Sequence, residues 1–585
     1  MSIFEQYRDV VAAAIAAAFP DAPQAAFTVE PPREAAHGDI ATNAAMTLAK
    51  PLGKPPRAIA EALVPHLLAE PTIDDAAIAG PGFINLRLKP DAWHGELRKI
   101  LQAGIAYGDC DIGKGVKVNV EYVSANPTGP MHAGHVRGAV IGDTVANLLQ
   151  KAGYDVTREY YFNDAGTQVD VLARTAYLRY REALGEDIGA IPEGLYPGEY
   201  LKDVGQALAA RDGKKWLEQD EAVWLEPIRD FAVAHMMGVI REDLALIGIQ
   251  HSVFTNERDL IADGTLEKSF KILQDMDLIY TGTLPPPRGK TMEDWEPVPL
   301  TLFRSSKFGD NTDRPLKKRD GTWAYIMPDI AYHYDKIRRG YMMMVNVLGK
   351  DHGGYLERLR PAVAAFTDGK AHLNVIFNAI VKLYNNGELV KLSKRSGNLI
   401  TLKEMVEQVG AGAVRFFMLS RTPDAELEFD FAKVIEQTRD NPVFYVQYAH
   451  ARCCSVIRHA REAYGDKAED LAKLAALPLA RLDGAAELGL LRFLAGWPRI
   501  VATAAEAQEP HRIAYYLIDL AGHFHGLWNK GREDAAMRFL IPGDDEVSLS
   551  RVALVQAARV VLASALAVLG VTPLAELRDE QSVAA

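Results

Sequence analysis

Two pairs of basic side chains, far apart in the chain, have the residue types and spacing needed to bind a triphosphate. The first pair is His132 and His135, which bracket Ala-Gly directly after Pro-Thr-Gly-Pro. The second pair is Lys391 and Lys394, in the segment KLSKRSGN. Imidazole N–H and lysine ammonium groups donate hydrogen bonds to phosphate oxygens and stabilise the charge that grows on departing pyrophosphate. Together the two segments predict a displacement at phosphorus.

Each segment alone has a less specific interpretation. Two histidines at i and i+3 share a helix face and could bind zinc, but no third ligand lies near His132 in the sequence. An isolated histidine pair is more often structural than catalytic. The segment KLSKRSGN by itself is typical of a solvated basic loop, although a capping box from Thr401 to Glu404 begins a helix directly after it.

The first pair lies where a strand is followed by a helix. Residues 116–123 alternate with a period close to two, which predicts a strand, and residues 133–152 have a helical pattern that ends at Gly153. The N-terminus of a helix favours phosphate because its N–H groups lack intrahelical partners. Gly134 has no Cβ, so a nucleotide can approach the backbone closely. We therefore predict that the triphosphate binds at this turn, at the carboxyl end of a strand.

Patterning along the chain predicts an α/β fold with a Rossmann-type parallel sheet, a helical insertion and two flanking regions. The segment 1–110 has the pattern of a small α+β domain. A second strand at 154–162 completes a βαβ unit, which favours a parallel sheet. Residues 166–300 are mostly helical and polar, and strands recur at 341–348 and 374–383. After about residue 405 strand signals vanish, which predicts an all-α bundle.

Composition excludes several classes of protein. The chain has 585 residues, of which 48% are hydrophobic, and a net charge of −12, so bulk electrostatic adhesion to nucleic acid is not expected. Local basic segments occur at 314–321 and 391–395. Three cysteines cannot form a disulfide framework or a Cys-x-x-Cys zinc site. No apolar run reaches ~18 residues without a charge, and the N-terminus lacks a signal-peptide pattern. We expect a cytoplasmic protein without structural zinc.

The two basic segments resemble the paired HIGH and KMSKS signatures of class I aminoacyl-tRNA synthetases. Further blocks make the chain similar to the arginyl-tRNA synthetase family over nearly its whole length: SANPTGPMHAGH (124–135), EYYFNDAGTQ (159–168), DGTWAYIMPDIAYHYDK (320–336), VLGKDHGGY (347–355) and NPVFYVQYAHAR (441–452). Ala133 replaces the second signature residue, and Leu392 and Arg395 replace Met and Ser in the second signature. Both histidines and both lysines are kept, so these departures do not put the activity in doubt.

The resemblance implies an arginine–tRNA ligase. Such an enzyme adenylates L-arginine with Mg-ATP, releases pyrophosphate and transfers the arginyl group to the 3′ end of its tRNA. The implied partners are arginine and tRNA, with no membrane, and the implied state is a monomer. The implied domains are an N-terminal additional tRNA-binding domain (1–110), a Rossmann catalytic domain (111–405) with its insertion (166–300), a helical stem-contact region (406–455) and a DALR-type anticodon-binding bundle (456–585).

The resemblance also assigns the site residues. The catalytic residues are His132, His135, Lys391 and Lys394. The ATP-binding residues are Thr128, Gly129, Pro130, His132, Gly134, His135, Gly349, Asp351, His352 and Ser393. The arginine-binding residues are Glu121, Ser124, Asn126, Tyr325 and Asp329.

Some of these assignments have alternatives in the sequence. Asp329 alone is more typical of a helix N-cap before IAYHYDKI, and Asp351 could equally be a carboxylate at a helix start. His523, His525 and Trp528 could contact RNA, but an amphipathic helix more often buries its aromatic rings.

Two other classes of protein would share part of this pattern. A small-molecule nucleotidyltransferase has an HxGH site but neither the insertion nor the bundle. A non-catalytic tRNA-binding paralogue should have lost a signature histidine or lysine.

Overall fold

The computed structural model describes residues 2–284, 298–350, 353–354, 356–390 and 400–577. The chain forms two compact units. The first comprises residues 1–112, 437–508 and 512–585, and the second comprises residues 113–436 with 509–511. His132 and the predicted arginine-binding residues all belong to the second unit.

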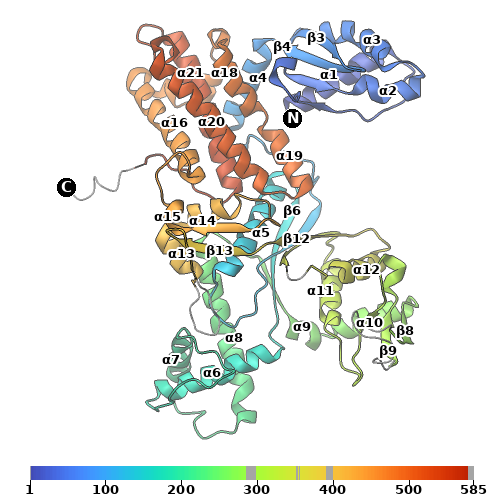
Figure 1. Ribbon diagram of the computed structural model, residues 1–585, viewed down its shortest axis with the longest axis vertical. Coiled ribbons are helices and arrows are strands. Elements are labelled where there is room, and N and C mark those ends of the chain that lie inside the picture. The colour runs from blue at the N-terminus through green and yellow to red at the C-terminus, as the bar shows by residue number, and fades with distance from the viewer. Residues whose placement is uncertain (1, 285–297, 351–352, 355, 391–399, 578–585) are drawn as a thin grey trace, which may run out of the picture. The chain divides into compact units, whose positions relative to one another are not determined.

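The first unit begins with a small α+β region, shown in blue in Figure 1. Its four-stranded antiparallel sheet has the order β1-β2-β4-β3. The strands are β1 (Val29–Glu30), β2 (Ile40–Thr42), β3 (Ile73–Ala79) and β4 (Phe83–Leu88), and the helices are α1 (Ile3–Ala18), α2 (Ala44–Leu52) and α3 (Pro56–Leu68). Helix α1 begins with a capping box in which Ser2 and Glu5 satisfy each other's backbone N–H groups. The predicted α+β character of this region is confirmed.

The rest of the first unit is a helical bundle whose long helices run side by side (Figure 1). They are α16 (Pro442–Tyr464), α18 (Ala485–Ala495), α19 (Trp497–Ala507), α20 (His511–Glu533) and α21 (Asp545–Val568). Among the described residues, α21 alone is long and apolar enough to cross a membrane, and 83% of its most apolar window is buried inside the protein. A helix that is apolar all round has this composition when it forms the centre of a bundle. Helix α4 (Pro90–Ala103) packs against α18 and α21.

The second unit is built on the predicted parallel sheet, with strand order β12-β11-β5-β6-β7. The strands are β5 (Lys117–Glu121), β6 (Asp155–Phe162), β7 (Val253–Asn256), β11 (Met343–Gly349) and β12 (His372–Asn378). Helix α5 (Ala133–Lys151) connects β5 to β6, as the βαβ pattern predicts. The register places Glu121 opposite Glu159 on one side and Asn346 on the other. The carboxyl ends of these strands therefore meet at one edge, the usual ligand site of such a sheet.

The predicted insertion is only partly helical. It contains α6 (Thr167–Ala183), α7 (Leu201–Asp212) and α8 (Glu221–Leu246), but β7 within it pairs with β6 of the core sheet. After β7 come α9 (Glu257–Ala262), α10 (Thr265–Asp275), a three-stranded antiparallel sheet of β8 (Ile279–Gly282), β9 (Leu300–Phe303) and β10 (Arg314–Pro315), α11 (Ile326–Arg338) and α12 (Leu356–Thr367). A four-residue strand has too short a pattern to be recognised from sequence.

Two further predictions about strands are wrong. Residues 374–383 do not form one strand, because the chain leaves the parallel sheet at Ala379, whose N–H donates to the Pro423 carbonyl, and continues as β13 (Val381–Asn385). Strands also continue beyond residue 405, since β15 (Leu427–Asp430) pairs in parallel with β13 in a second sheet with β14 (Glu388–Leu389). Ile380 between the sheets is 75% exposed, so hydrophobicity gave no sign of the break.

Candidate active site

The turn after β5 has a strained backbone. Val123 and Ser124 have φ values of 70° and 43°, in the left-handed region that a β-branched residue rarely enters. The turn carries the Ser124 hydroxyl back over the strand end, where it donates to Glu121 Oε1 at 3.0 Å. Strain of this kind persists where the surrounding contacts hold it, and it clusters at functional sites.

The two histidines lie at the start of α5, where backbone N–H groups fix the position of the proton on each ring. His132 is the N-cap residue, and its Nδ1 accepts the Gly134 N–H at 3.2 Å. His135 Nδ1 accepts the backbone N–H of His132 at 3.5 Å. A ring nitrogen that accepts a hydrogen bond carries no proton, so in each neutral imidazole the proton is on Nε2. The ring centroids are 3.8 Å apart. Both rings therefore present an Nε2–H donor beside a helix N-terminus, where an anion is favoured.

The chain that follows the KLSKR segment is anchored at the same turn. Leu402 N–H donates to the Met131 carbonyl at 2.9 Å, and Ala133 N–H donates to the Ile400 carbonyl at 3.1 Å. The predicted capping box is confirmed, since Thr401 Oγ1 accepts the Glu404 N–H and the Glu404 carboxylate accepts the Thr401 N–H. The two signatures are more than 250 residues apart in sequence. The chain that begins five residues after the second signature is thus hydrogen-bonded to the first.

Other predicted nucleotide-binding residues lie around this turn. Tyr200 OH donates to the Thr128 carbonyl at 2.7 Å, and a Cβ on Gly129 would lie 3.1 Å from that same hydroxyl. Pro130 lies between this contact and the histidines. Gly134 is exposed, and a Cβ there would lie 3.0 Å from the His132 ring, so glycine also keeps His132 in its capping position. Gly349 ends β11 at the same sheet edge. The predicted residues Asp351, His352, Lys391, Ser393 and Lys394 lie outside the described residues.

Three predicted arginine-binding residues lie together at the end of β5. Glu121 is buried and its carboxylate is held by Ser124 and by the ammonium group of Lys336. Asn126 donates from Nδ2 to Gln168 Oε1 at 3.0 Å and accepts the Asn163 N–H at 3.2 Å. Glu121 and Ser124 are therefore in contact, and Asn126 lies two residues further on, beside the residue that follows β6.

Asp329 is not a helix N-cap. Helix α11 begins at Ile326, four residues earlier than the cap interpretation requires, and its N-cap Tyr325 makes no side-chain capping bond. Asp329 therefore lies within the helix and is half-buried. Its carboxylate is close enough to Tyr161 to act on it electrostatically: burial, then the charges of Asp329 and Glu257, raise the pKa of Tyr161. Tyr325 is 81% exposed, and the charges of Asp329 and Glu257 act on its hydroxyl.

The sequence did not reveal the residues that lie between the end of β5 and Asp329. Tyr161, near the end of β6, donates to Glu257 Oε2 at 2.8 Å, and Asn163 Nδ2 donates to the same oxygen at 2.8 Å. Burial raises the pKa of Glu257, and Asp164 adds to this, against the lowering effect of the Tyr161 hydrogen bond. Tyr161 and Asn163 belong to the block EYYFNDAGTQ, which was a usable signal. Glu257 was hidden because β7, which it follows, was taken as part of a helical insertion.

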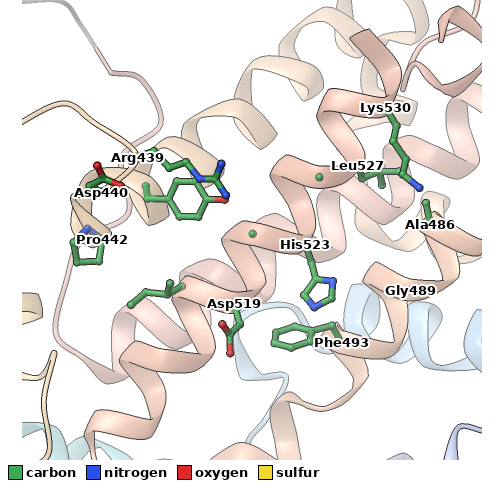
Figure 2. Close-up of a pocket in the computed structure, with 14 residues that line it drawn as sticks. Arg439, Asp440, Pro442, Ala486, Gly489, Phe493, Asp519, His523, Leu527 and Lys530 are labelled. Carbon is green, nitrogen blue, oxygen red and sulfur yellow. The ribbon is translucent and has the colours of Figure 1, made fainter. Parts of the chain in front are cut away.

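The bundle contains a cavity of about 780 Å³, shown in Figure 2. Its lining includes Arg439, Tyr445, Phe493, Asp519, His523 and Lys530. The His523 ring is exposed and lies 4.4 Å from the Phe493 ring between centroids. The cavity thus combines aromatic faces with charges of both signs.

The predicted RNA contacts in α20 separate into two kinds. His525 is buried, its Nε2 hydrogen-bonds to the Tyr445 carbonyl, and burial lowers its pKa to about 4, so it has a structural role. Trp528 is half-buried under the guanidinium of Arg452, 4.9 Å from its ring centroid. Of the three predicted residues, His523 is the one whose ring is both exposed and part of the cavity lining.

Known protein families match three segments of the chain. Residues 5–88 match the arginyl tRNA synthetase N terminal domain, residues 96–188 match the catalytic domain of class I (R) tRNA synthetases, and residues 446–577 match the DALR anticodon binding domain. Among the described residues, no group of three or more His, Cys, Asp or Glu side chains is arranged to hold a metal ion.

Similar whole proteins are also known. An arginine–tRNA ligase of Nitrobacter hamburgensis is 58% identical over 94% of this chain and 93% of its own. One from Cereibacter sphaeroides is 54% identical over 99% of this chain and all of its own. The solved structure of Thermus thermophilus arginyl-tRNA synthetase superposes with a TM-score of 0.73 at 21% identity, covering 98% of this chain and 100% of that chain. At that identity the superposition shows the fold.

Proposed function

Because the chain belongs to the arginyl-tRNA synthetase family, we propose that it performs the reaction named for its relatives, ligation of arginine to tRNA. Arginine is first joined to ATP as arginyl-adenylate, and the arginyl group is then transferred to the 3′ end of tRNA. In the first step the arginine carboxylate forms a bond to the α-phosphorus, and the bond to pyrophosphate breaks. In the second step a terminal ribose hydroxyl forms the ester bond and AMP leaves. No covalent enzyme intermediate is required, so catalysis consists of positioning and charge stabilisation.

The arginine pocket lies between two groups of residues at the carboxyl edge of the sheet. We assign the α-ammonium group of arginine to Glu121 and Asn126, whose side-chain oxygens would accept its hydrogen bonds. The Ser124 hydroxyl holds the carboxylate of Glu121 in place. The guanidinium is assigned to Asp329 and Glu257, with Tyr161 between them. A planar cation with a fork of donors pairs with ionised carboxylates. A bound guanidinium would itself favour the charged form of Glu257, whose pKa burial raises. The observation that carries the assignment is the hydrogen bond from the Tyr161 hydroxyl to Glu257 Oε2 at 2.8 Å, which places this carboxylate beside the ring on which Asp329 also acts electrostatically.

The triphosphate is assigned to the turn at the start of α5. The Nε2–H donors of His132 and His135 and the N–H groups of the helix N-terminus would face the phosphate oxygens. The anchoring of Ile400 and Leu402 at the same turn supports a role for Lys391 and Lys394 in holding pyrophosphate. ATP enters as its magnesium complex, a substrate of the reaction. We also propose that the protein is a cytoplasmic monomer, with tRNA contacts in 1–110, 406–455 and 456–585.

The bundle cavity is the proposed site for a nucleotide of the anticodon. A base could stack against the rings of Phe493 and His523, as single-stranded bases stack on aromatic side chains. Asp519 could accept from a base N–H group, and Lys530 could pair with a phosphate. Substitution of Asp519 by Asn should change which anticodon the protein prefers. Lys530→Met should instead lower the affinity for all tRNAs alike and reduce the salt dependence of binding. Equal charging of all anticodon variants by Asp519→Asn and the unchanged protein would contradict this assignment.

The central experiment is arginine-dependent exchange between ATP and pyrophosphate, with and without tRNA. A ligase exchanges label when arginine is present and goes on to charge tRNA. A small-molecule nucleotidyltransferase would exchange label without regard to arginine, and a tRNA-binding paralogue would bind tRNA without exchange. Each result identifies one of the three classes.

A further inference from the structure

A chain of buried polar side chains lies behind the arginine pocket and joins its two ends. Lys336, on α11, is wholly buried, and its Nζ lies 2.7 Å from Glu121 Oε2 and 3.3 Å from Asn346 Oδ1. Asn346, on β11, donates from Nδ2 to His333 Nε2 at 3.0 Å. His333 in turn donates from Nδ1 to the backbone carbonyl of Asp329 at 2.8 Å. The path therefore runs from the carboxylate of Glu121 to the helical turn that carries Asp329.

This arrangement is costly for the fold. Burying an ammonium group and a carboxylate removes both from water, and well-packed apolar residues of similar volume are often as stable as such a pair or more so. Lys336 Nζ also lies 4.3 Å from the centre of the Tyr332 ring, and this cation–π contact offsets part of the cost of removing the ammonium group from water. Stability alone does not account for a lysine at this position, so a role in the adjacent site is a better explanation.

We propose that Lys336 and Asn346 are positioning residues that hold Glu121 and Asp329 at the separation that matches arginine. The inference rests on the proposed binding of the α-ammonium group by Glu121 and of the guanidinium by Asp329. It goes beyond that assignment, because neither Lys336 nor Asn346 is assigned a contact with arginine. They act through the groups that are.

The geometry explains how each residue acts. Glu121 is held at both oxygens, Oε2 by Lys336 and Oε1 by Ser124, so its carboxylate cannot rotate without losing a partner. Asn346 accepts from Lys336 and donates to His333 with the two ends of one amide. An aspartate would keep the first bond and lose the second, because an ionised carboxylate only accepts.

The consequence is selection by length. Homoarginine carries the same charged groups as arginine with one more methylene between them. If the ends of the pocket are fixed, homoarginine cannot satisfy both, and if they are released the discrimination falls. One methylene is worth roughly 10- to 200-fold in selectivity when a pocket is rigid.

The first test is a double-mutant cycle between Lys336 and Glu121, measured by pyrophosphate exchange with tRNA present. Lys336→Met should lower kcat/KM for arginine by roughly 100-fold or more, because it leaves a buried carboxylate unpaired. The same change in the Glu121→Gln background should cost clearly less, because only the path through Asn346 to Asp329 then remains to be lost. The activity of Lys336→Met should also rise with pH, because an unpaired buried carboxylate has a raised pKa. Lys271→Met, at an exposed ion pair on α10, is the matched control.

The second test uses Asn346→Asp, which is nearly isosteric and decides the question if Lys336→Met does not fold. Selectivity for arginine over homoarginine should fall roughly 10-fold, with the KM for ATP unchanged. Effects of Lys336→Met and Glu121→Gln that multiply, or an Asn346→Asp variant with unchanged selectivity, would overturn the inference. If Glu121→Gln and Asp329→Asn themselves leave the KM for arginine unchanged, the pocket assignment fails instead.

Discussion

Replacing Asp329 by Asn tests whether this pocket is built for a permanent cation. The change keeps the shape of the side chain and removes its charge, which leaves one side of a desolvated guanidinium unpaired. Removal of one partner from a buried ion pair typically costs ~3–5 kcal/mol. Asp329 is half-buried, and Glu257 supplies a second carboxylate beside Tyr161, so the loss should be near the lower end of that range. A loss of ~3 kcal/mol corresponds to roughly a 100-fold fall in kcat/KM for arginine.

The fall in kcat/KM should concern arginine and not ATP. Initial rates of pyrophosphate exchange, with tRNA present, should give a raised KM for arginine and a nearly unchanged KM for ATP. Citrulline has the shape of arginine without the charge, and its oxygen would face the carboxylate of Asp329. The unchanged protein should therefore reject citrulline. In Asp329→Asn the new amide can donate to that oxygen, so this variant should discriminate less between arginine and citrulline.

Stability separates this role from a structural one. Asp329 is not the N-cap residue of α11, and a carboxylate in the first turn of a helix contributes only ~0.3–1 kcal/mol through the helix dipole. The thermal midpoint should therefore change little, as it should for the control Asp275→Asn on the exposed end of α10. A KM for arginine within a few-fold of the unchanged value, together with a lower thermal midpoint, would refute the reasoning and move the search for the carboxylate to Glu257 or Glu121.

Three further predictions follow from the structure and the family. His132→Ala and His135→Ala should each lower the adenylation rate by roughly 100- to 1,000-fold, as loss of one oriented donor does, with the KM for arginine little changed; weak arginine binding at normal turnover would assign them elsewhere. RNA-free protein should show little pyrophosphate exchange until tRNA is added, since tRNA must favour the competent pocket by a coupling of ~1–3 kcal/mol or more; strong exchange without tRNA would contradict this. His525 is neutral in the folded protein down to about pH 4, whereas an unfolded histidine binds its proton below about pH 6.5. The unfolded state thus binds more protons in this window, so stability falls as pH falls, and denaturant titrations of His525→Gln should show a slope smaller by about 1.4 kcal/mol per pH unit; an unchanged slope would mean that His525 is charged in the fold.

Local patterns in the sequence determined the proposed triphosphate side of the site. The turn from β5 into α5, the position of His132 and His135 at a helix start, and the capping box at Thr401 each depend on residues within a few positions of one another. The parallel sheet was predictable for a related reason, since a strand, a helix and a second strand without interruption leave few other connections. These features need no knowledge of distant partners.

Tertiary structure decided the proposed arginine side of the site. Asp329 was ambiguous because a carboxylate before an apolar helical run has the pattern of a cap, and only the true start of α11 shows that it lies inside the helix. Glu257 belongs to the proposed pocket only because β7 joins the core sheet and brings it to Tyr161, 96 residues earlier in the chain. Lys336 appears in the sequence as an ordinary lysine near a helix end, yet it is fully buried against a carboxylate 215 residues away. The burial and the charge partner of a side chain are properties of the packed fold, and no local pattern of residues carries them.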